Sequence, residues 1–287
     1  MRVMALAGHI IQANVNHSAS AQDLLLQAMA EHGTGLAVIA EPYRIPQLNC
    51  CGDSTGMAAI IRAGKNDSPA ITTITKGQGY VIVQWGEMYI AGLYASPNAP
   101  LSSLQAMLDD MRNKIAPLMS EDLIICGDFN AKSTLWGSPR TNPRGEAVTE
   151  WAAELDLQLL NDGRENTCVR WQGESKVDLT WASPSAAHKI KLWRVATEME
   201  TLSDHRYIFI EMEPRGGDGQ CKRQTKQQGQ GKEKRLEDRH HPRWAVKRLN
   251  EDRLKIAAQA AAWLQNCPRE TEAESPPLLQ KVWIRNC

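Results

Sequence analysis

The stretch Leu123-Ile-Ile-Cys-Gly-Asp-Phe-Asn130 decides the fold class of this chain. Its first four residues are apolar and predict a strand buried on both faces, as in sheets that helices cover. A carboxylate without a partner is costly inside such a strand, so we expect Asp128 to emerge at its end, where Gly127 permits a sharp turn. Side chains two positions apart on an extended chain point the same way. Asp128 and Asn130 are therefore expected to face one common site.

Apolar runs and segments of helical spacing alternate on both sides of this stretch. The spacing predicts helices over residues 20–32, 102–118 and 145–155. Strands are predicted at residues 36–40, 58–61, 80–85, 89–94, 123–126, 157–160, 167–171, 176–181 and 207–211. Many strands with few helical crossovers indicate mixed sheets faced by helices, and hence an α/β sandwich.

The net charge of zero is an average of two opposite parts. Residues 1–213 carry 17 basic and 24 acidic side chains, whereas residues 214–287 carry 16 and 9. The change coincides with a stretch rich in Gly, Gln and Lys, so we expect a basic disordered linker over residues 214–241, with contact to nucleic acid as the alternative. Residues 242–287 have partly helical spacing and too few apolar residues for a core of their own. We therefore expect one globular domain, residues 1–213, followed by a linker and a connector.

Several classes of protein are excluded by what the sequence lacks. It has no run of 18 apolar residues and no basic-then-apolar leader, so we expect neither a membrane span nor a signal peptide. The seven cysteines are odd in number and include no Cys-x-x-Cys pair, which argues against a disulfide framework and a zinc knuckle. A reducing compartment is the simplest expectation.

Polar and acidic side chains gather where the predicted strands end. Six segments share this property: residues 12–16, 40–43, 94–98, 127–130, 175–178 and 203–205. Alone, Glu41 could be a loop acid before Pro42, and residues 203–205 could be an ordinary turn. Asn14 and Asn16 could simply make strand-end hydrogen bonds, and residues 127–130 are the most specific of the six segments. Together they would bring several carboxylates and one histidine to one rim, and such a cluster repels itself unless a divalent cation or shared protons neutralise it. The full set, in this order and spacing, therefore predicts a functional site at that rim.

With these six segments in this order, the chain resembles the exonuclease-endonuclease-phosphatase (DNase I-like) superfamily. Within it, the chain is most similar to the apurinic/apyrimidinic-type endonuclease domain of non-LTR (LINE-type) retrotransposons. Gly127-Asp-Phe-Asn-Ala-Lys-Ser133, followed by Leu135-Trp-Gly137, is typical of the retrotransposon branch, and Pro242–Asn250 resembles the connector that precedes a reverse transcriptase. The resemblance covers residues 1–213 and implies a four-layer α/β sandwich of two mixed β-sheets flanked by helices.

The resemblance also implies a metal site. Glu41 would be the principal ligand of one Mg²⁺, for which Mn²⁺ is a possible substitute, and Asp204 and Asn14 would complete its shell. Asn16 stands where the cellular repair enzymes have an acid, which weakens any claim for a second metal.

Catalytic roles are implied for the remaining motif residues. Asp128 would orient and deprotonate the attacking water, and Asn130 would hold the scissile phosphate. His205 would contact a phosphate oxygen while Asp178 fixes its ring. Tyr94, with Asn14, would complete the catalytic group.

Four residues are expected to contact DNA. Asn98 would help Tyr94 to shape the phosphate pocket, and Lys132 lies among the basic residues near the motifs. Arg170 and Trp171 lie in Thr167-Cys-Val-Arg-Trp-Gln-Gly-Glu-Ser175, where Gln172-Gly173 suits a tight hairpin turn. Arg170 can bond guanine edges and Trp171 can wedge or stack. The alternative is an ordinary hairpin with Trp171 packed on the sheet.

The implied reaction is hydrolysis of one strand of double-stranded DNA, which leaves a 3′-hydroxyl that primes reverse transcription. The partners would be double-stranded DNA in the nucleus and, in a longer polyprotein, the element RNA, with no membrane. No reverse-transcriptase segment is present in this sequence, so that activity is not assigned. The alternatives are an abasic-site repair endonuclease, a sister phosphatase or phosphodiesterase of the same superfamily, and a catalytically decayed DNA-binding remnant.

Overall fold

Two six-stranded sheets lie face to face in the computed structural model, which describes residues 8–64 and 68–213. The first sheet has the order β13 (Ile190–Val195), β14 (Ile208–Met212), β1 (His9–Asn14), β2 (Leu36–Ala40), β4 (Ala58–Arg62) and β3 (Cys50–Gly52). The second has the order β5 (Ile71–Gly77), β6 (Tyr80–Trp85), β7 (Met88–Tyr94), β8 (Asp122–Asp128), β12 (Asp178–Ala182) and β9 (Gln158–Leu159). Each sheet contains one parallel pair, β1–β2 or β7–β8, among antiparallel ones, so both sheets are mixed.

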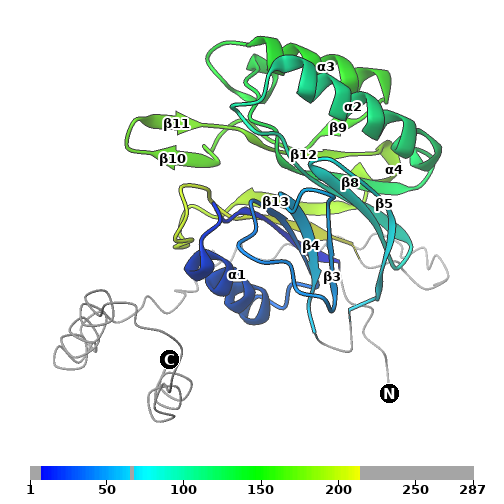
Figure 1. Ribbon diagram of the computed structural model, residues 1–287, viewed down its shortest axis with the longest axis vertical. Coiled ribbons are helices and arrows are strands. Elements are labelled where there is room, and N and C mark those ends of the chain that lie inside the picture. The colour runs from blue at the N-terminus through cyan, green and yellow to red at the C-terminus, as the bar shows by residue number, and fades with distance from the viewer. Residues whose placement is uncertain (1–7, 65–67, 214–287) are drawn as a thin grey trace, which may run out of the picture. The chain divides into compact units, whose positions relative to one another are not determined.

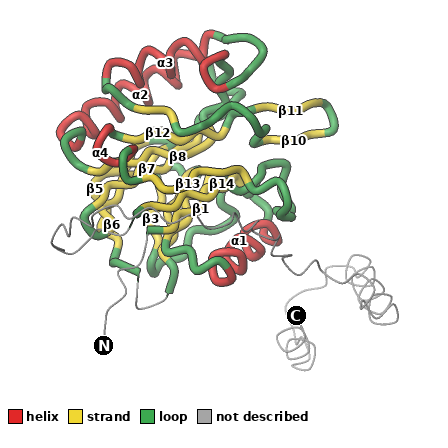
Figure 2. Tube along the Cα trace, turned by 180° about the vertical axis from the view of Figure 1, so that it is seen from behind, coloured by secondary structure: helices red, strands yellow, loops and turns green. Residues whose placement is uncertain are grey.

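Helices cover the outer face of each sheet and complete four layers (Figures 1 and 2). One sheet is covered by α1 (Ala19–Glu31), and the other by α2 (Leu101–Ile115) and α3 (Pro143–Glu154). The short elements are α4 (Pro184–Ala187) and the 3₁₀ turns Ala116–Leu118 and Thr134–Trp136. This is the predicted DNase I-like sandwich.

The three largest apolar cores of the described residues correspond to the three contacts between layers. Between the sheets lie aliphatic residues from both, including Ile10, Val38, Val83, Ile124 and Ile208. Leu25 and Met29 of α1 pack on the outer face of the first sheet. On the second sheet, α2 and α3 supply Leu108, Met111 and Trp151. Because strands of both sheets are buried on both faces, their sequences are continuous apolar runs rather than alternating ones.

All the predicted helices and strands are present, with ends shifted by a few residues. Helix α1 begins at Ala19, because the Ser18 hydroxyl accepts a hydrogen bond from the N–H of Ala21 and caps the helix there. Five strands were not predicted: β1, β3, β5, β11 and β13. Strands β3, β5 and β13 lie at sheet edges and leave several side chains partly or fully exposed, so none has the apolar run that identified the inner strands. Strand β1 is an inner strand, but Gln12 and Asn14 interrupt its apolar run, and β11 is a short exposed strand of the hairpin.

A separate two-stranded hairpin, β10 (Cys168–Arg170) and β11 (Gly173–Ser175), extends away from the layers (Figure 1). The turn predicted at Gln172-Gly173 is one residue too late, since Trp171 and Gln172 form it and Arg170 pairs with Gly173. Gly173 has a φ of +143° at the start of the return strand, so its freedom is needed just after the turn rather than inside it.

The strand directions bring the motif residues to one edge. β7 and β8 are parallel with Tyr94 opposite Asp128, and β12 runs antiparallel to β8 with Asp178 opposite Asp128. The two sheets are joined beneath this edge by Gln12 of β1, whose side-chain amide donates to the carbonyls of Gly127 (3.2 Å) and Leu179 (3.3 Å). The end of β1 is thereby fixed against the ends of β8 and β12.

Two expectations fall on other parts of the chain. The predicted linker, residues 214–241, and the predicted connector, residues 242–287, lie outside the described residues. No helix in the described ranges has both the length and the apolar composition that a bilayer crossing requires.

Candidate active site

Asp128, Asp178 and His205 form a buried group at the strand ends. Their ligand atoms lie within 4.8 Å of one another. Asp178 and Asp128 face each other across β12 and β8, and the Nδ1–H of His205 donates to Oδ2 of Asp178 at 2.8 Å. The hydroxyl of Thr167 accepts the backbone N–H of both Val177 and Asp178, which fixes the start of β12. The group is therefore held rigidly by the sheet and its neighbours.

The carboxylate of Asp128 is held by amide donors. Asn130 donates its backbone N–H to Oδ1 and its side-chain amide to Oδ2, both at 2.9 Å, and Asn14 donates to Oδ2 at 3.0 Å. Burial, followed by the charge of Asp178, raises the pKa of Asp128 to about 7, against the lowering effects of His205 and these hydrogen bonds. A buried carboxylate with a pKa near neutral is suited to accept a proton.

His205 is the positive partner in this group. Burial by itself lowers the pKa of His205, but the charge of Asp178 and its hydrogen bond outweigh burial. With smaller contributions from Cys168 and Asp128, they raise that pKa to about 11. An imidazolium ion is thus placed beside two carboxyl groups, where it can meet negative charge that develops on a bound substrate.

Glu41 lies on the other side of Asn14. It follows β2 with a left-handed φ of +48°, an uncommon conformation for a residue other than glycine. The amide of Asn14 donates to Glu41 Oε2 at 3.0 Å while it also donates to Asp128, so Asn14 bridges the two carboxylates. Burial and a hydrogen bond to Glu41 raise the pKa of the Tyr94 phenol, which keeps it protonated and able to donate.

Asp204 lies next to His205 in the chain but has different partners. Its Oδ1 accepts the side-chain amide of Asn16 at 3.3 Å, and its Oδ2 pairs with Arg170 Nε at 2.6 Å. The backbone N–H of Val169 also donates to the Asp204 carbonyl at 2.7 Å. The base of the hairpin is thereby attached to the loop that carries Asp204 and His205.

Two sets of side chains carry donors suited to a divalent cation. Glu41 and Asp204 have the hard carboxylate oxygens that Mg²⁺ prefers. Asn14 directs its amide N–H groups at Glu41 and Asp128 while its Oδ1 accepts the N–H of Asn16 at 2.8 Å, so its amide would have to turn to face an ion at Glu41. The side chains of Glu41 and Asp204 are 15% and 31% exposed, so solvent and an ion can reach both. In the described part of the chain, Asp128, Asp178 and His205 are the group whose three ligand atoms lie closest together, but Asp178 and His205 already pair with each other.

The remaining predicted residues lie on the rim. Asn98 and Lys132 are exposed in the loops that follow β7 and β8. Trp171 is 91% exposed at the hairpin tip, so the alternative in which it packs on the sheet is wrong.

Arg144 is a structural member of the site whose supporting role was not predicted from the sequence. Its guanidinium donates to four backbone carbonyls, those of Asn130 (2.9 Å), Ala95 (3.1 Å), Ala99 and Phe129 (both 3.3 Å). It also lines a cavity of about 430 Å³ beside Tyr94. An arginine in the first turn of α3 thus holds the loops after β7 and β8 together. The only signal in the sequence is its proximity to the Gly-Asp-Phe-Asn stretch.

Comparison with known proteins gives consistent matches. Residues 88–209 match the family described as endonuclease-reverse transcriptase. The RNA-directed DNA polymerase from the mobile element jockey of Drosophila melanogaster is 28% identical over 117 residues, which are 39% of this chain and 12% of that protein. Among solved structures, the endonuclease domain of TRAS1, a telomere-specific non-LTR retrotransposon, is 25% identical with a TM-score of 0.63, and the match covers 74% of this chain and all of that domain.

More distant structures share the fold. A 3′ phosphatase from Neisseria bound to product DNA hairpin is 14% identical, with a TM-score of 0.57, over 72% of this chain and 100% of that one. An AP endonuclease from Archaeoglobus fulgidus is 11% identical, with a TM-score of 0.55, over 72% of this chain and 99% of that one.

Proposed function

Since this chain carries an endonuclease-like domain of the non-LTR retrotransposon type, within the endonuclease–exonuclease–phosphatase superfamily, we propose that it is a Mg²⁺-dependent endonuclease. It nicks one strand of double-stranded DNA and leaves a 3′-hydroxyl. The observation that carries the proposal is the continuous hydrogen-bonded connection from Glu41 through Asn14 to Asp128, beside the Asp178–His205 pair. In this proposal, the connection brings together the cation-binding carboxylate of Glu41, the base Asp128 and the positive charge of His205 at the strand ends.

Asp128 orients the attacking water and takes its proton. Its pKa of about 7 lies close to neutral pH, where a general base is most effective. The donors from Asn130 and Asn14 fix the orientation of the carboxylate, and Asn130 also holds the scissile phosphate in this proposal. Arg144 supports the backbone of Asn130 and thus keeps the base and the phosphate aligned.

His205 contacts a phosphate oxygen through the ring nitrogen that does not face Asp178. Its positive charge stabilises the negative charge that grows on the phosphoryl oxygens during displacement. Tyr94 and Asn98 shape the phosphate pocket. A divalent ion held by Glu41, with Asp204 and Asn14, would supply further charge neutralisation, as Mg²⁺ or as Mn²⁺.

The hairpin provides contacts beyond the phosphate. The residues of the rim grip a group that all DNA shares, so target choice requires a contact with bases or with groove shape. Trp171 is exposed at the hairpin tip, and Arg170 joins the hairpin to Asp204. The residues proposed to contact bases therefore lie next to the residues proposed to carry out the reaction. Lys132 adds a phosphate contact from the loop after β8.

In its biological setting, the nick would prime reverse transcription of a retrotransposon at its nuclear target. The chain matches 12% of the length of the jockey protein, so the polymerase step and the binding of element RNA belong to a longer protein in this proposal.

A substrate panel tests the proposal. The full chain is incubated with supercoiled plasmid and Mg²⁺, with a duplex that contains one abasic site, and with an inositol phosphate. We expect nicked circles from the complete reaction and no nicking when a chelator is present from the start. Excess Mg²⁺ or Mn²⁺ added to the chelated enzyme should restore nicking. Cleavage restricted to the abasic duplex would replace the proposal by a repair endonuclease, and phosphate release from inositol phosphate by a phosphatase. DNA binding without cleavage would indicate a decayed remnant.

A further inference from the structure

The turn that follows β1 has an uncommon backbone. Asn16 and His17 are consecutive residues in the left-handed region, with φ of +51° and +53°, and Glu41 opposite them has φ of +48°. Glycine adopts this conformation more readily than histidine does. Strain of this kind at non-glycine residues persists where the side chain has a function or the surroundings impose the conformation. The left-handed backbone therefore makes the side chain of His17 a candidate for a function.

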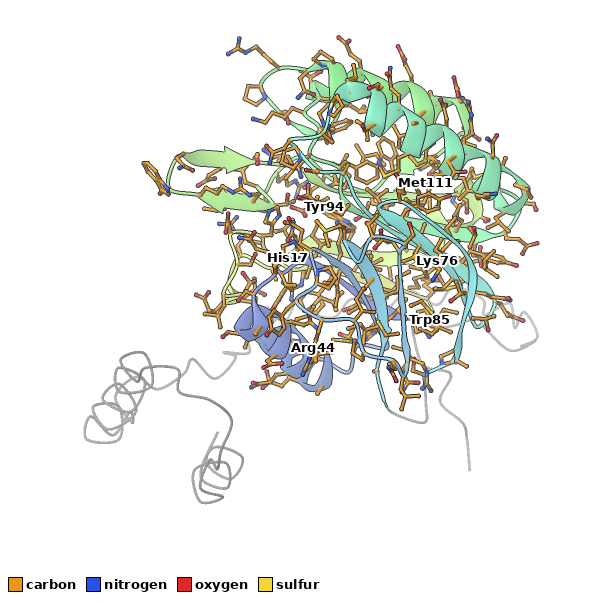
Figure 3. The ribbon with its side chains drawn as sticks, viewed as in Figure 1. His17, Arg44, Lys76, Trp85, Tyr94 and Met111 are labelled. Atoms are coloured by element: carbon orange, nitrogen blue, oxygen red, sulfur yellow. The ribbon has the colours of Figure 1, made fainter. Side chains whose placement is uncertain are left out.

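His17 makes two contacts with Glu41 and a third with the next residue, Pro42. Its backbone N–H donates to the Glu41 carbonyl at 2.8 Å, and its Nδ1 bonds the carbonyl of Pro42 at 3.1 Å. Its Nε2 lies 3.7 Å from Glu41 Oε1. The turn thus brings the imidazole to the carboxylate whose other oxygen accepts from Asn14 and to which Tyr94 also bonds, and Figure 3 labels both His17 and Tyr94.

The hydrogen bond to Pro42 decides which ring nitrogen is available. A carbonyl oxygen only accepts, so Nδ1 must carry the proton of this hydrogen bond. In the neutral imidazole, Nε2 then carries the lone pair, and this nitrogen lies 3.7 Å from Glu41 Oε1. An Nδ1–H held by a backbone carbonyl is the usual arrangement of a metal-binding histidine, because it fixes both the tautomer and the ring orientation.

We infer that His17 Nε2 is a further ligand of the divalent cation held at Glu41. The inference rests on the proposed function, because it assumes that the cation binds at Glu41. The His17 side chain is 50% exposed, so its nitrogen is open to an ion from solvent. Imidazole suits transition metals such as Mn²⁺, whereas Mg²⁺ is bound through oxygen. His17 therefore makes this site favour Mn²⁺ over Mg²⁺ more strongly than a site of carboxylates and amides alone would.

The matched variant is His17→Gly. Glycine fits the left-handed turn without strain, so we expect the variant to fold at least as well as the wild type, with an unchanged or higher Tm. His17→Gln is a second variant that keeps a polar side chain of similar length. Mn²⁺ binding to the full chain is measured by electron paramagnetic resonance, and nitrogen coupling to bound Mn²⁺ is measured by electron spin echo spectroscopy. Mg²⁺ affinity follows from competition.

We expect Mn²⁺ affinity to fall by about tenfold or more in both variants, as for the loss of one ligand contact, while Mg²⁺ affinity changes much less. We also expect imidazole nitrogen coupling in the wild type and its loss in His17→Gly. Equal Mn²⁺ affinity and equal coupling in wild type and His17→Gly would overturn the inference, even if plasmid nicking continues. Coupling lost only in His205→Gln would place the ion at the Asp128 group and overturn it too. Absence of both Mn²⁺ binding and nicking in the wild type would instead refute the proposed function.

Discussion

Replacement of Asp178 by asparagine should move the alkaline limb of the pH–rate profile to lower pH. Burial lowers the pKa of His205, but the charge of Asp178 and the 2.8 Å hydrogen bond to it hold that pKa at about 11. The substitution removes the charge and leaves only a neutral amide oxygen as a weaker acceptor. In the variant, the pKa of His205 should fall to its ordinary value of 6.5 or below. In the wild type the imidazolium persists well above neutral pH, so nicking should stay high through pH 8.

The size of the effect follows from that shift. A histidine of pKa 6.5 is about 3% protonated at pH 8, so the variant should be about 30-fold slower at pH 8 than at a pH where His205 is fully protonated, from the loss of the imidazolium alone. The acid limb should move in the same direction, because the charge of Asp178 is also a cause of the raised pKa of Asp128. The two limbs belong to a coupled group, so both are measured as apparent values.

The assay is nicking of supercoiled plasmid from pH 5 to pH 10 at saturating Mg²⁺. Asp122→Asn is the matched control, because Asp122 is a buried carboxylate in the adjacent strand β8, at the opposite end from Asp128, and is paired with Lys189. The control should lower stability without moving either limb. If the alkaline limb of Asp178→Asn coincides with that of the wild type, the account of His205 as an imidazolium is refuted.

Three further outcomes are expected. Asp128→Ala and His205→Ala should each lower the nicking rate by about 10²-fold or more, and near-wild-type rates would remove the residue from the mechanism. Both side chains are buried and His205 pairs with Asp178, so thermal unfolding of each variant is measured beside its nicking rate to separate lost catalysis from lost folding. A Gly/Ser turn in place of residues 170–174 should scatter the nick positions on a mapped plasmid while total nicking changes less than about tenfold, and an unchanged map would assign target choice to another loop. The fragment of residues 1–213 should fold alone and keep Mg²⁺-dependent nicking, and a molten fragment would show that the tail is part of the fold.

The fold could be predicted where burial determines the sequence. Inner strands such as β2 and β8 are continuous apolar runs because both faces of each strand are buried, and Asp128 had to lie at a strand end because an unpaired carboxylate is costly inside. Edge strands β5 and β13 were missed because solvent on one side removes that constraint. The hairpin turn was misplaced by one residue because Gly173 is required just after the turn, and a glycine alone does not say on which side of it the turn lies.

The site was predictable as a set of residues and not as a set of contacts. The polar strand ends could be found in the sequence, but the pairing of Asp178 with Asp128 depends on the register of β12 against β8. The role of Arg144 depends on a tertiary contact between α3 and two loops, and no local pattern encodes it. The position of His17 beside Glu41 follows from two left-handed turns that meet in space, which spacing along the chain does not reveal.

The most direct test of the central claim is the chemistry of the ends that the full chain leaves on plasmid DNA. Nicked circles made with Mg²⁺ are offered to a DNA polymerase with labelled nucleotides, without prior phosphatase treatment, and Asp128→Asn is run in parallel. The account predicts circles that are labelled directly, because each nick carries a 3′-hydroxyl, and almost no label with the variant. Intact plasmid, nicks that require phosphatase before extension, or equal labelling with Asp128→Asn would contradict it.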